Sequence, residues 1–165
     1  MVSRPWRVNK ISFFESFSYS KSRIRCRYGA MEAVELFVHF DDGDPAGIVF
    51  FGHYFRMAHR ALELSLPQVG LEWKDFFQSA TVGFPVRHSE AQYHRPLLPG
   101  APVSVKVIPE KVGESSLTFR YEFRKESSVD SDLLAELRVV HVCVDVKSLK
   151  KAPLPEKIKS AFVVS

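Results

Sequence analysis

Residues 42–55 read D-G-D-P-A-G-I-V-F-F-G-H-Y-F, a turn cluster that runs into an apolar and aromatic segment. Pro45 and Gly47 keep a helix from starting early, and aspartates in such turns hydrogen-bond the local backbone. The first N–H groups of a helix that begins near Phe51 lack internal partners and carry the positive end of the helix dipole. A carbonyl placed there would be polarised, and the Asp44 carboxylate could attack it or deprotonate water. Turn chemistry alone would also explain an aspartate at this position.

Residues 50–66 predict one long amphipathic helix. Its apolar face carries, at helical spacing, Phe51, Tyr54, Phe55, Ala58, Leu62 and Ser65. Its polar face carries His53, Arg56, Arg60 and Glu63, and His59 lies on the flank between the two faces. Gly70 ends this region, and the segment 73–79 predicts a short second helix.

Five segments have the length and alternation of strands, namely residues 32–40, 84–95, 102–111, 116–125 and 133–146. The turns between the last four are short, so we expect antiparallel pairing as a meander or near-meander. A single helix against one such sheet predicts a two-layer α+β domain whose sheet edges stay available for a partner subunit. Pro153 and Pro155 cannot join a ladder and predict the end of ordered structure.

The positive charge of the chain is concentrated at its N-terminus. Residues 1–30 hold seven of the 23 Lys and Arg residues and one of the 19 acidic residues, which leaves the remainder slightly acidic. The remainder therefore lacks the basic surface of a nucleic-acid-binding domain. Residues 1–30 resemble an organelle transit peptide in composition, but the pattern that opens at Met31 favours a flexible extension, translated from a start codon upstream of the true one.

Several other classes of protein are disfavoured. No stretch reaches 18 apolar residues, so no membrane-spanning helix is expected. The six histidines show no metal-ligand spacing, and neither a Gly-rich phosphate loop nor a G-x-S-x-G motif is present. Cys26 and Cys143 are too few and too distant for a disulfide framework, which fits a reduced, cytoplasmic setting.

The segment 42–55 resembles the motif of the 4-hydroxybenzoyl-CoA thioesterase family of hotdog-fold enzymes. The positions that carry the resemblance are Asp44, Gly47, Ile48, Val49, Phe51 and Tyr54. Segments 84–100 and 133–145 are similar to later strands of the family, so the resemblance covers roughly residues 32–155. It implies a hotdog domain over residues 31–155, with one long central helix wrapped by a five-stranded antiparallel sheet, and a C-terminal tail at 156–165.

The resemblance implies an acyl-CoA thioesterase that needs no cofactor or metal. Asp44 matches the residue that attacks the thioester or activates water, and the backbone N–H of Phe51 matches the group that polarises its carbonyl. It also implies a homodimer or homotetramer, with sites at the subunit interface and without nucleic-acid or membrane partners. The substrate-binding candidates are Gly47, Ile48, Val49, Phe50, Gly52, Tyr54, Phe55 and His88. Weaker CoA-binding candidates are Arg87, Lys111, Ser115 and Ser116.

Three departures from the family pattern bear on the substrate. Gly43 replaces a common Thr or Cys, and Phe51 stands where some members have His. His59 stands where many members carry an acid that lies near the 4-hydroxybenzoyl phenol, which argues against that substrate. A histidine there, with His88 and the K-K-A-P-L-P segment at 150–155, is similar to 1,4-dihydroxy-2-naphthoyl-CoA thioesterases. His59 is therefore a third candidate for the catalytic site.

Two other functions remain open at this stage. A thioesterase that acts on acyl carrier protein would be expected to present a basic docking patch, which the slightly acidic domain disfavours. A non-catalytic acyl-CoA-binding module is the second alternative, and the presence of Asp44 argues against it. A hotdog dehydratase is disfavoured because its active-site histidine motif is not visible.

Overall fold

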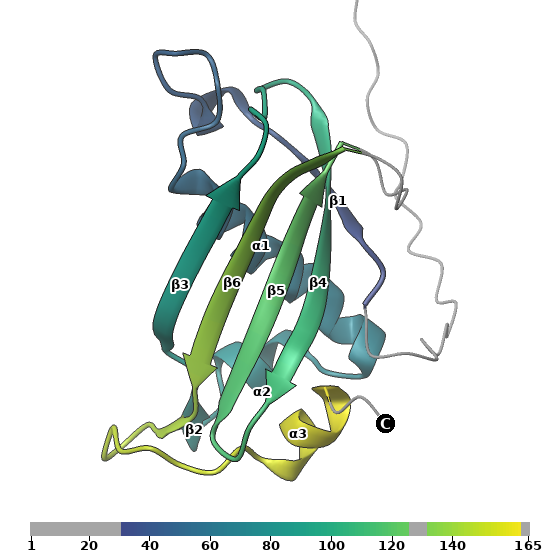
Figure 1. Ribbon diagram of the computed structural model, residues 1–165. Helices are drawn as coiled ribbons and strands as arrows, with labels where there is room; N and C mark the ends of the chain where they lie inside the picture. The colour runs from purple at the N-terminus through teal and green to yellow at the C-terminus, as the bar shows by residue number, and fades with distance from the viewer. Residues whose placement is uncertain (1–30, 126–131, 163–165) are drawn as a thin grey trace, which may run out of the picture.

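The computed structural model describes residues 31–125 and 132–162, which form a two-layer α+β domain (Figure 1). The predicted extension at 1–30 lies outside the described residues. The main sheet has five antiparallel strands in the order β1-β4-β5-β6-β3. They are β1 (Val34–Phe37), β3 (Val86–Tyr93), β4 (Pro102–Val112), β5 (Ser116–Arg124) and β6 (Leu133–Val142). The predicted fold class, with its five-stranded antiparallel sheet and long helix, is confirmed.

The strand order departs from a plain meander at one point. Strands β4, β5 and β6 follow one another as neighbours, but β3 pairs with β6 and not with β4, its successor in the chain. Residues 94–101 therefore cross the sheet from one edge strand towards the other, where the sequence suggested a turn between neighbours. Two short strands, β2 (Val82–Gly83) and β7 (Val144–Asp145), pair as a separate two-stranded sheet.

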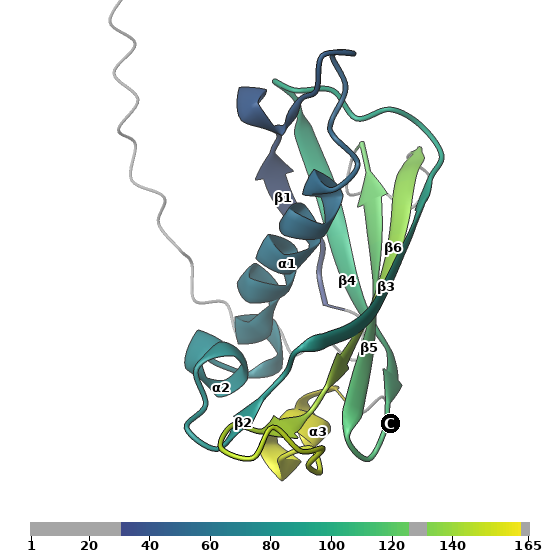
Figure 2. The same cartoon turned by 90° about the vertical axis from the view of Figure 1, so that its left-hand side faces the viewer.

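The long helix α1 (His53–Ser65) covers only part of the sheet. It packs against β4 and β1 and leaves the inner side of β3 less covered (Figure 2). Of the predicted apolar face, Tyr54, Ala58 and Leu62 are buried, whereas Phe55 is half-buried and Phe51 is exposed because it precedes the first helical turn. Shorter helices follow in η2 (Leu66–Val69) and α2 (Trp73–Phe77), the second of which confirms the short helix predicted after Gly70.

Strand β3 contains an irregularity that sets which side chains face α1. Ser89 lies opposite the buried Val139 of β6, so Ser89 is on the inner face of the sheet. Regular alternation would then place Arg87 on that face as well. The register shifts between Val86 and His88, however, and Val86 becomes the partner of the buried His141.

The chain continues past the point where the sequence predicted ordered structure to end. Helix α3 (Glu156–Phe162) follows Pro155, whose carbonyl accepts hydrogen bonds from the N–H groups of Ile158 and Lys159. Proline is well suited to a helix start because its missing N–H would be unpaired there anyway. Ile158 and Phe162, four residues apart, are buried, and the Phe162 ring lies 5.1 Å from that of Phe119. The prediction that residues after Pro155 form an unstructured tail is therefore wrong.

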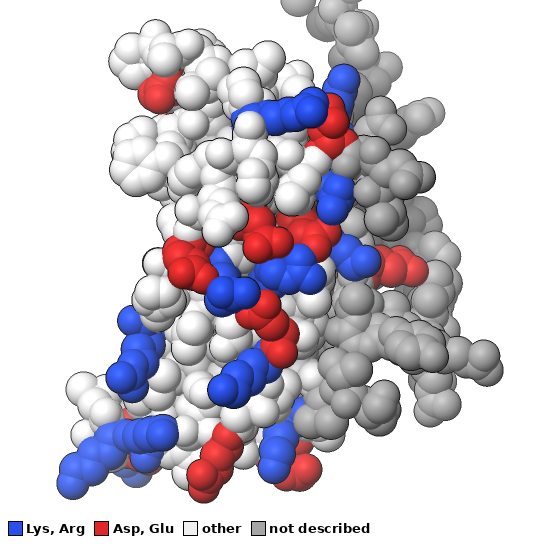
Figure 3. All heavy atoms as spheres, in the orientation of Figure 1, with Lys and Arg blue, Asp and Glu red and all other residues white. Residues whose placement is uncertain are grey.

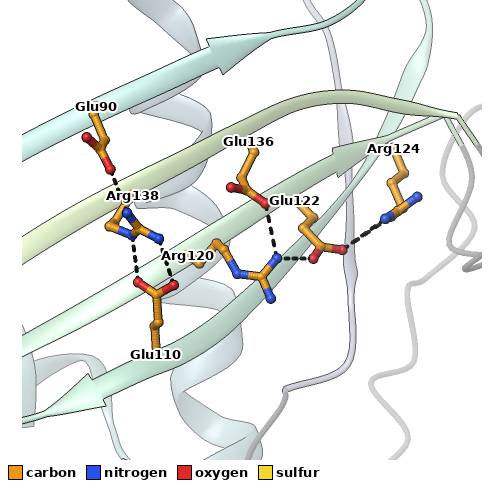
Figure 4. Close-up of polar contacts among 7 residues, drawn as sticks. All are labelled: Glu90, Glu110, Arg120, Glu122, Arg124, Glu136 and Arg138. Atoms are coloured by element: carbon orange, nitrogen blue, oxygen red, sulfur yellow. Dashed lines mark hydrogen bonds and ion pairs between the residues drawn. The ribbon is translucent and has the colours of Figure 1, made fainter.

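The outer face of the sheet, away from α1, is covered by paired charges. Arg120 bonds to Glu122 and to Glu136, while Arg138 bonds to Glu90 and Glu110, the latter through two nitrogens (Figure 4). Figure 3 shows positively and negatively charged side chains interleaved across the middle of this face. No helix within residues 31–125 and 132–162 is long and apolar enough to cross a membrane.

Candidate active site

Asp44 sits at the first position of a closed loop. Its N–H donates to the carbonyl of Ile48 at 2.8 Å, and its own carbonyl accepts from the N–H of Gly47 at 2.9 Å. The carboxylate Oδ1 also accepts the N–H of Ala46 at 2.8 Å. Gly47 has a φ of +78°, which a side chain would strain, so the glycine in the motif serves the turn. The carboxylate of Asp44 is thereby held in one place while staying partly exposed.

Asp42 ties this loop to the start of α1. It ends the short helix η1 (Phe40–Asp42), and its carbonyl accepts the N–H of Phe50 at 2.9 Å and lies 3.1 Å from His53 Nδ1. Its carboxylate is buried, pairs with Arg56 and accepts the N–H of His39 at 2.8 Å. Asp42 could not be assigned to this region from the sequence, because its contacts reach residues up to 14 positions away. Its place two residues before Asp44 was the only available signal.

The backbone around Phe51 presents a free N–H donor at the helix start. His53 N–H bonds to the carbonyl of Phe50, and Phe55 N–H bonds to that of Gly52. Within the described residues, no carbonyl or side chain accepts the N–H of Phe51. The Phe51 carbonyl accepts the hydroxyl of Tyr93 at 3.1 Å, which links β3 to this point. The N–H of Phe51 is thus available to a ligand near the positive end of the α1 dipole.

The glycine at position 43 has a packing reason. A Cβ there would lie 2.9 Å from Cγ of Pro99 and 3.4 Å from the carbonyl oxygen of Phe40. Pro99 belongs to the connection that crosses towards β4, and Val49 N–H bonds to Leu97 of the same connection. The departure of Gly43 from the family pattern therefore accompanies a close approach of this connection to the Asp44 loop.

A cavity of about 180 Å³ opens between α1 and the uncovered part of the sheet. Its apolar walls are Phe55, Ala58, Val86 and Val139. Its polar walls are His59, Ser89, Tyr121 and His141. Ligand sites usually measure about 300–1,000 Å³, so this cavity is suited to part of a ligand, such as an acyl group. A larger cavity of about 330 Å³ lies between α2 and α3 and contains none of the predicted site residues.

The two histidines of the smaller cavity differ in their surroundings. His59 is half-exposed, lies 3.0 Å from Glu63 Oε1 and has its ring 4.9 Å from that of Phe77. His141 is buried, and its Nδ1 lies 2.9 Å from the carbonyl oxygen of Phe84. Burial lowers the pKa of His141; the hydrogen bond to Phe84 acts in the opposite sense, and the charge of His59 adds to the lowering.

Several predicted residues lie away from this region. His88 is on the outer face of β3, 3.6 Å from Glu90, and does not reach the cavity. Lys111, Ser115 and Ser116 lie at the β4–β5 turn, at the opposite end of the sheet from the Asp44 loop (Figure 1). Lys111 lies nine residues along β4 from Pro102, the first residue of the strand, which is a distance of about 30 Å. Arg87 lies near the same far end, so within one protomer these CoA-binding candidates are not brought to Asp44.

The described residues contain no cluster of three or more His, Cys, Asp or Glu side chains that could hold a metal ion. Cys143 is free and buried, and its Sγ lies 3.3 Å from the carbonyl oxygen of Pro153.

The part of the chain that contains this site matches a known protein family. The profile of the thioesterase-like superfamily matches residues 38–162, which include the Asp44 loop, α1 and the whole sheet from β3 onward. The chain belongs to this superfamily. The predicted resemblance to hotdog-fold acyl-CoA thioesterases is thus confirmed, and the match extends through α3.

Curated members of the superfamily are similar over most of their length. A 1,4-dihydroxy-2-naphthoyl-CoA hydrolase of Nostoc punctiforme is 34% identical over 121 residues, which cover 73% of this chain and 79% of the relative. One from Microcystis aeruginosa is 31% identical over 125 residues, with 76% and 88% covered. Among solved structures, a 1,4-dihydroxy-2-naphthoyl-CoA thioesterase from Synechocystis superposes with a TM-score of 0.71 at 26% identity, covering 81% of this chain and 95% of the other.

Proposed function

We propose that the protein hydrolyses an aromatic acyl-CoA to the free acid and CoA, with 1,4-dihydroxy-2-naphthoyl-CoA as the first candidate substrate. The two curated relatives and the Synechocystis structure bear that activity in their names. The cavity beside α1 has aromatic and aliphatic walls with a few polar groups, which suits a ring system better than a long flexible chain. The 4-hydroxybenzoyl ester is the second candidate.

The observation that carries the proposal is the pairing of one fixed carboxylate with one free N–H. Asp44 is fixed by the loop that closes between Gly43 and Val49, and Asp42 joins this loop to the start of α1. A thioester carbonyl that docks at the helix start would accept the free Phe51 N–H. An oxyanion that develops there is stabilised by a donor already in place.

Two sequences of steps are compatible with this arrangement. In the first, an Asp44 oxygen attacks the thioester carbonyl carbon, the carbonyl electrons move to the oxygen held by Phe51 N–H, and CoA leaves as a thiolate. Water then hydrolyses the mixed anhydride and restores the carboxylate. In the second, Asp44 removes a proton from water, and the hydroxide attacks the carbonyl directly.

Thiol release from a panel of acyl-CoAs tests the proposal. The panel contains 1,4-dihydroxy-2-naphthoyl, 4-hydroxybenzoyl, phenylacetyl and straight-chain esters. Asp44→Asn should lower kcat by at least about 10²–10⁴-fold, because general-base assistance alone is worth that much. Asp41→Asn is the matched control, since Asp41 is an exposed neighbour with the same charge. Near-normal turnover by Asp44→Asn would remove this residue from the mechanism. Turnover of acyl carrier protein esters but not of CoA esters would show that the substrate is carried by a protein and not by CoA.

The proposed assembly is a homodimer or homotetramer with its sites at the interface. Strand β3 is an edge of the sheet, and seven of its eight residues are exposed. The region around the Asp44 loop also exposes Phe40 (94%), Phe51 (62%) and Phe37 (55%), an unusual amount of aromatic surface for a free monomer. Sedimentation velocity measures the assembly, and a stable monomer with full activity would contradict it. A cytoplasmic location fits the free thiol of Cys143 and is part of the same proposal.

A further inference from the structure

Four polar side chains line the cavity beside α1, and two of them come from buried residues that the reaction at Asp44 does not use. These two are the hydroxyl of Tyr121 on β5 and the imidazole of His141 on β6, both from buried residues of the inner sheet face. In the described part of the chain, neither the Tyr121 hydroxyl nor Nε2 of His141 has a hydrogen-bond partner. No fully enclosed side-chain nitrogen or oxygen lacks a partner in the same part of the chain, so neither atom is fully enclosed, and both residues line the cavity.

The hydrogen bond of His141 fixes what its free nitrogen can do. A carbonyl oxygen only accepts, so the 2.9 Å contact with Phe84 requires the proton to be on Nδ1. In the neutral ring, which burial favours, Nε2 is then an acceptor. Burial also raises the pKa of Tyr121, so its hydroxyl keeps its proton and can donate or accept. The cavity therefore offers an acceptor and a hydroxyl to the same ligand.

The position of the cavity matches the reach of an aromatic acyl group. Phe55, Ala58 and His59 lie four to eight residues after Phe51, which is about 6–12 Å along the axis of α1. If an acyl carbonyl is held at the Phe51 N–H, the aromatic ring attached to it reaches a comparable distance along α1. Val86 and Val139 add apolar contacts for a ring, and Ser89, the cross-strand partner of Val139, is a further polar wall on the sheet.

We propose that Tyr121 and His141 select acyl groups that carry a hydroxyl on the aromatic ring. A ring hydroxyl donates to Nε2 of His141, and the Tyr121 hydroxyl donates to a ring-hydroxyl oxygen. An unsubstituted ring would leave both buried groups without partners, which costs affinity. This inference rests on the proposed function only for the placement of the acyl carbonyl.

The decisive measurement compares two esters that differ only in ring hydroxyls, 1,4-dihydroxy-2-naphthoyl-CoA and 2-naphthoyl-CoA. The wild-type protein should show a kcat/KM at least about tenfold higher for the hydroxylated ester. Tyr121→Phe and His141→Phe should each lower kcat/KM for that ester by about tenfold and leave the value for 2-naphthoyl-CoA nearly unchanged. A residue with only a structural role would lower both values together, so the ratio between esters separates the two roles.

Controls keep this inference distinct from the proposed hydrolysis. Thr118→Val removes a hydroxyl from the outer face of β5 and should change neither ester. Titration calorimetry with 1,4-dihydroxy-2-naphthoate and 2-naphthoate measures selection without any reaction. If no ester is hydrolysed but the hydroxylated acid binds more tightly to wild type and not to Tyr121→Phe, the proposed function fails and the selection stands. Equal kcat/KM for both esters in wild type, or equal losses for both in Tyr121→Phe, would overturn the selection.

Discussion

The two faces of the sheet differ in whether their polar side chains have hydrogen-bond partners. On the outer face, arginines and glutamates of β3, β4, β5 and β6 satisfy one another, as the chain of contacts through Arg120 and Arg138 shows (Figure 4). On the inner face, Tyr121 and His141 keep a hydroxyl and a ring nitrogen without partners beside a cavity. Paired groups stabilise the fold and have little left for a ligand, whereas unpaired buried groups are costly unless a ligand completes them. The comparison predicts that changes on the inner side and at the Asp44 loop affect turnover, and that changes on the outer face affect only stability.

The largest combined effect is expected from Asp42→Ala. The substitution leaves Arg56 and the N–H of His39 without their acceptor, and the loss of these contacts to a buried carboxylate costs about 2–3 kcal/mol of unfolding free energy. Because the same residue positions the Asp44 loop, kcat should also fall by at least about tenfold. Urea denaturation and thiol release measure the two effects. Asp41→Ala should change neither, and an Asp42→Ala protein of full activity would refute the positioning role.

A smaller effect, confined to stability, is expected from Arg120→Met. The change leaves Glu136 without its arginine and removes one of the partners of Glu122, for a loss of about 1–2 kcal/mol. Thiol release should stay within about twofold of wild type, because Arg120 faces away from the cavity. Glu90→Gln is the comparison variant: its partner Arg138 keeps Glu110, so Tm should move by no more than about 1–2 °C. A large loss of turnover in Arg120→Met would erase the distinction between the faces.

The smallest effect is a dependence of stability on pH that originates at His141. Its pKa is lowered in the folded protein, chiefly by burial, from the ordinary value of about 6.5. As pH falls through 6.5, the unfolded chain takes up a proton that the folded protein still refuses, so the free energy of unfolding decreases until the lower, folded pKa is passed. Tm should therefore fall between pH 7.5 and 5.5, and His141→Phe should flatten that slope. The exposed His88→Asn variant should retain it, and a slope unchanged by His141→Phe would assign the dependence to other groups.

The sequence predicted those parts of the molecule that depend on local pattern. Alternation in residues 102–125 and 133–142 predicted strands, because one face of each strand is buried against α1. The turn chemistry around Asp44 and Gly47 was visible for the same reason. Asp42 and His141 were not assigned to the site, since their roles come from partners 14 and 57 positions away. Helix α3 was missed because two prolines were given more weight than the spacing of Ile158 and Phe162.

The position of β3 at the edge also lay beyond local reasoning. A short connection after Tyr93 suggested a hairpin to β4, but the pairing with β6 brings Ser89 and Val86 beside α1. The choice between these arrangements depends on which strand gains most from burial, a property of the whole sheet and not of one segment. The placement of His88 on the outer face follows from the same pairing.

The irregularity between Val86 and His88 adds one residue to β3, and this extra residue determines which side chain lines the cavity. With strict alternation from Ser89, a guanidinium would face α1 at position 87, and a cation would stand beside the imidazole of His141. The extra residue puts the isopropyl group of Val86 there instead, and Arg87 is turned to solvent. Deletion of Val86 would restore strict alternation and place the Arg87 side chain where an apolar wall now stands, without altering the cavity side chains of α1, β5 or β6. The apolar character of this wall therefore depends on the number of residues in β3 as well as on their identity.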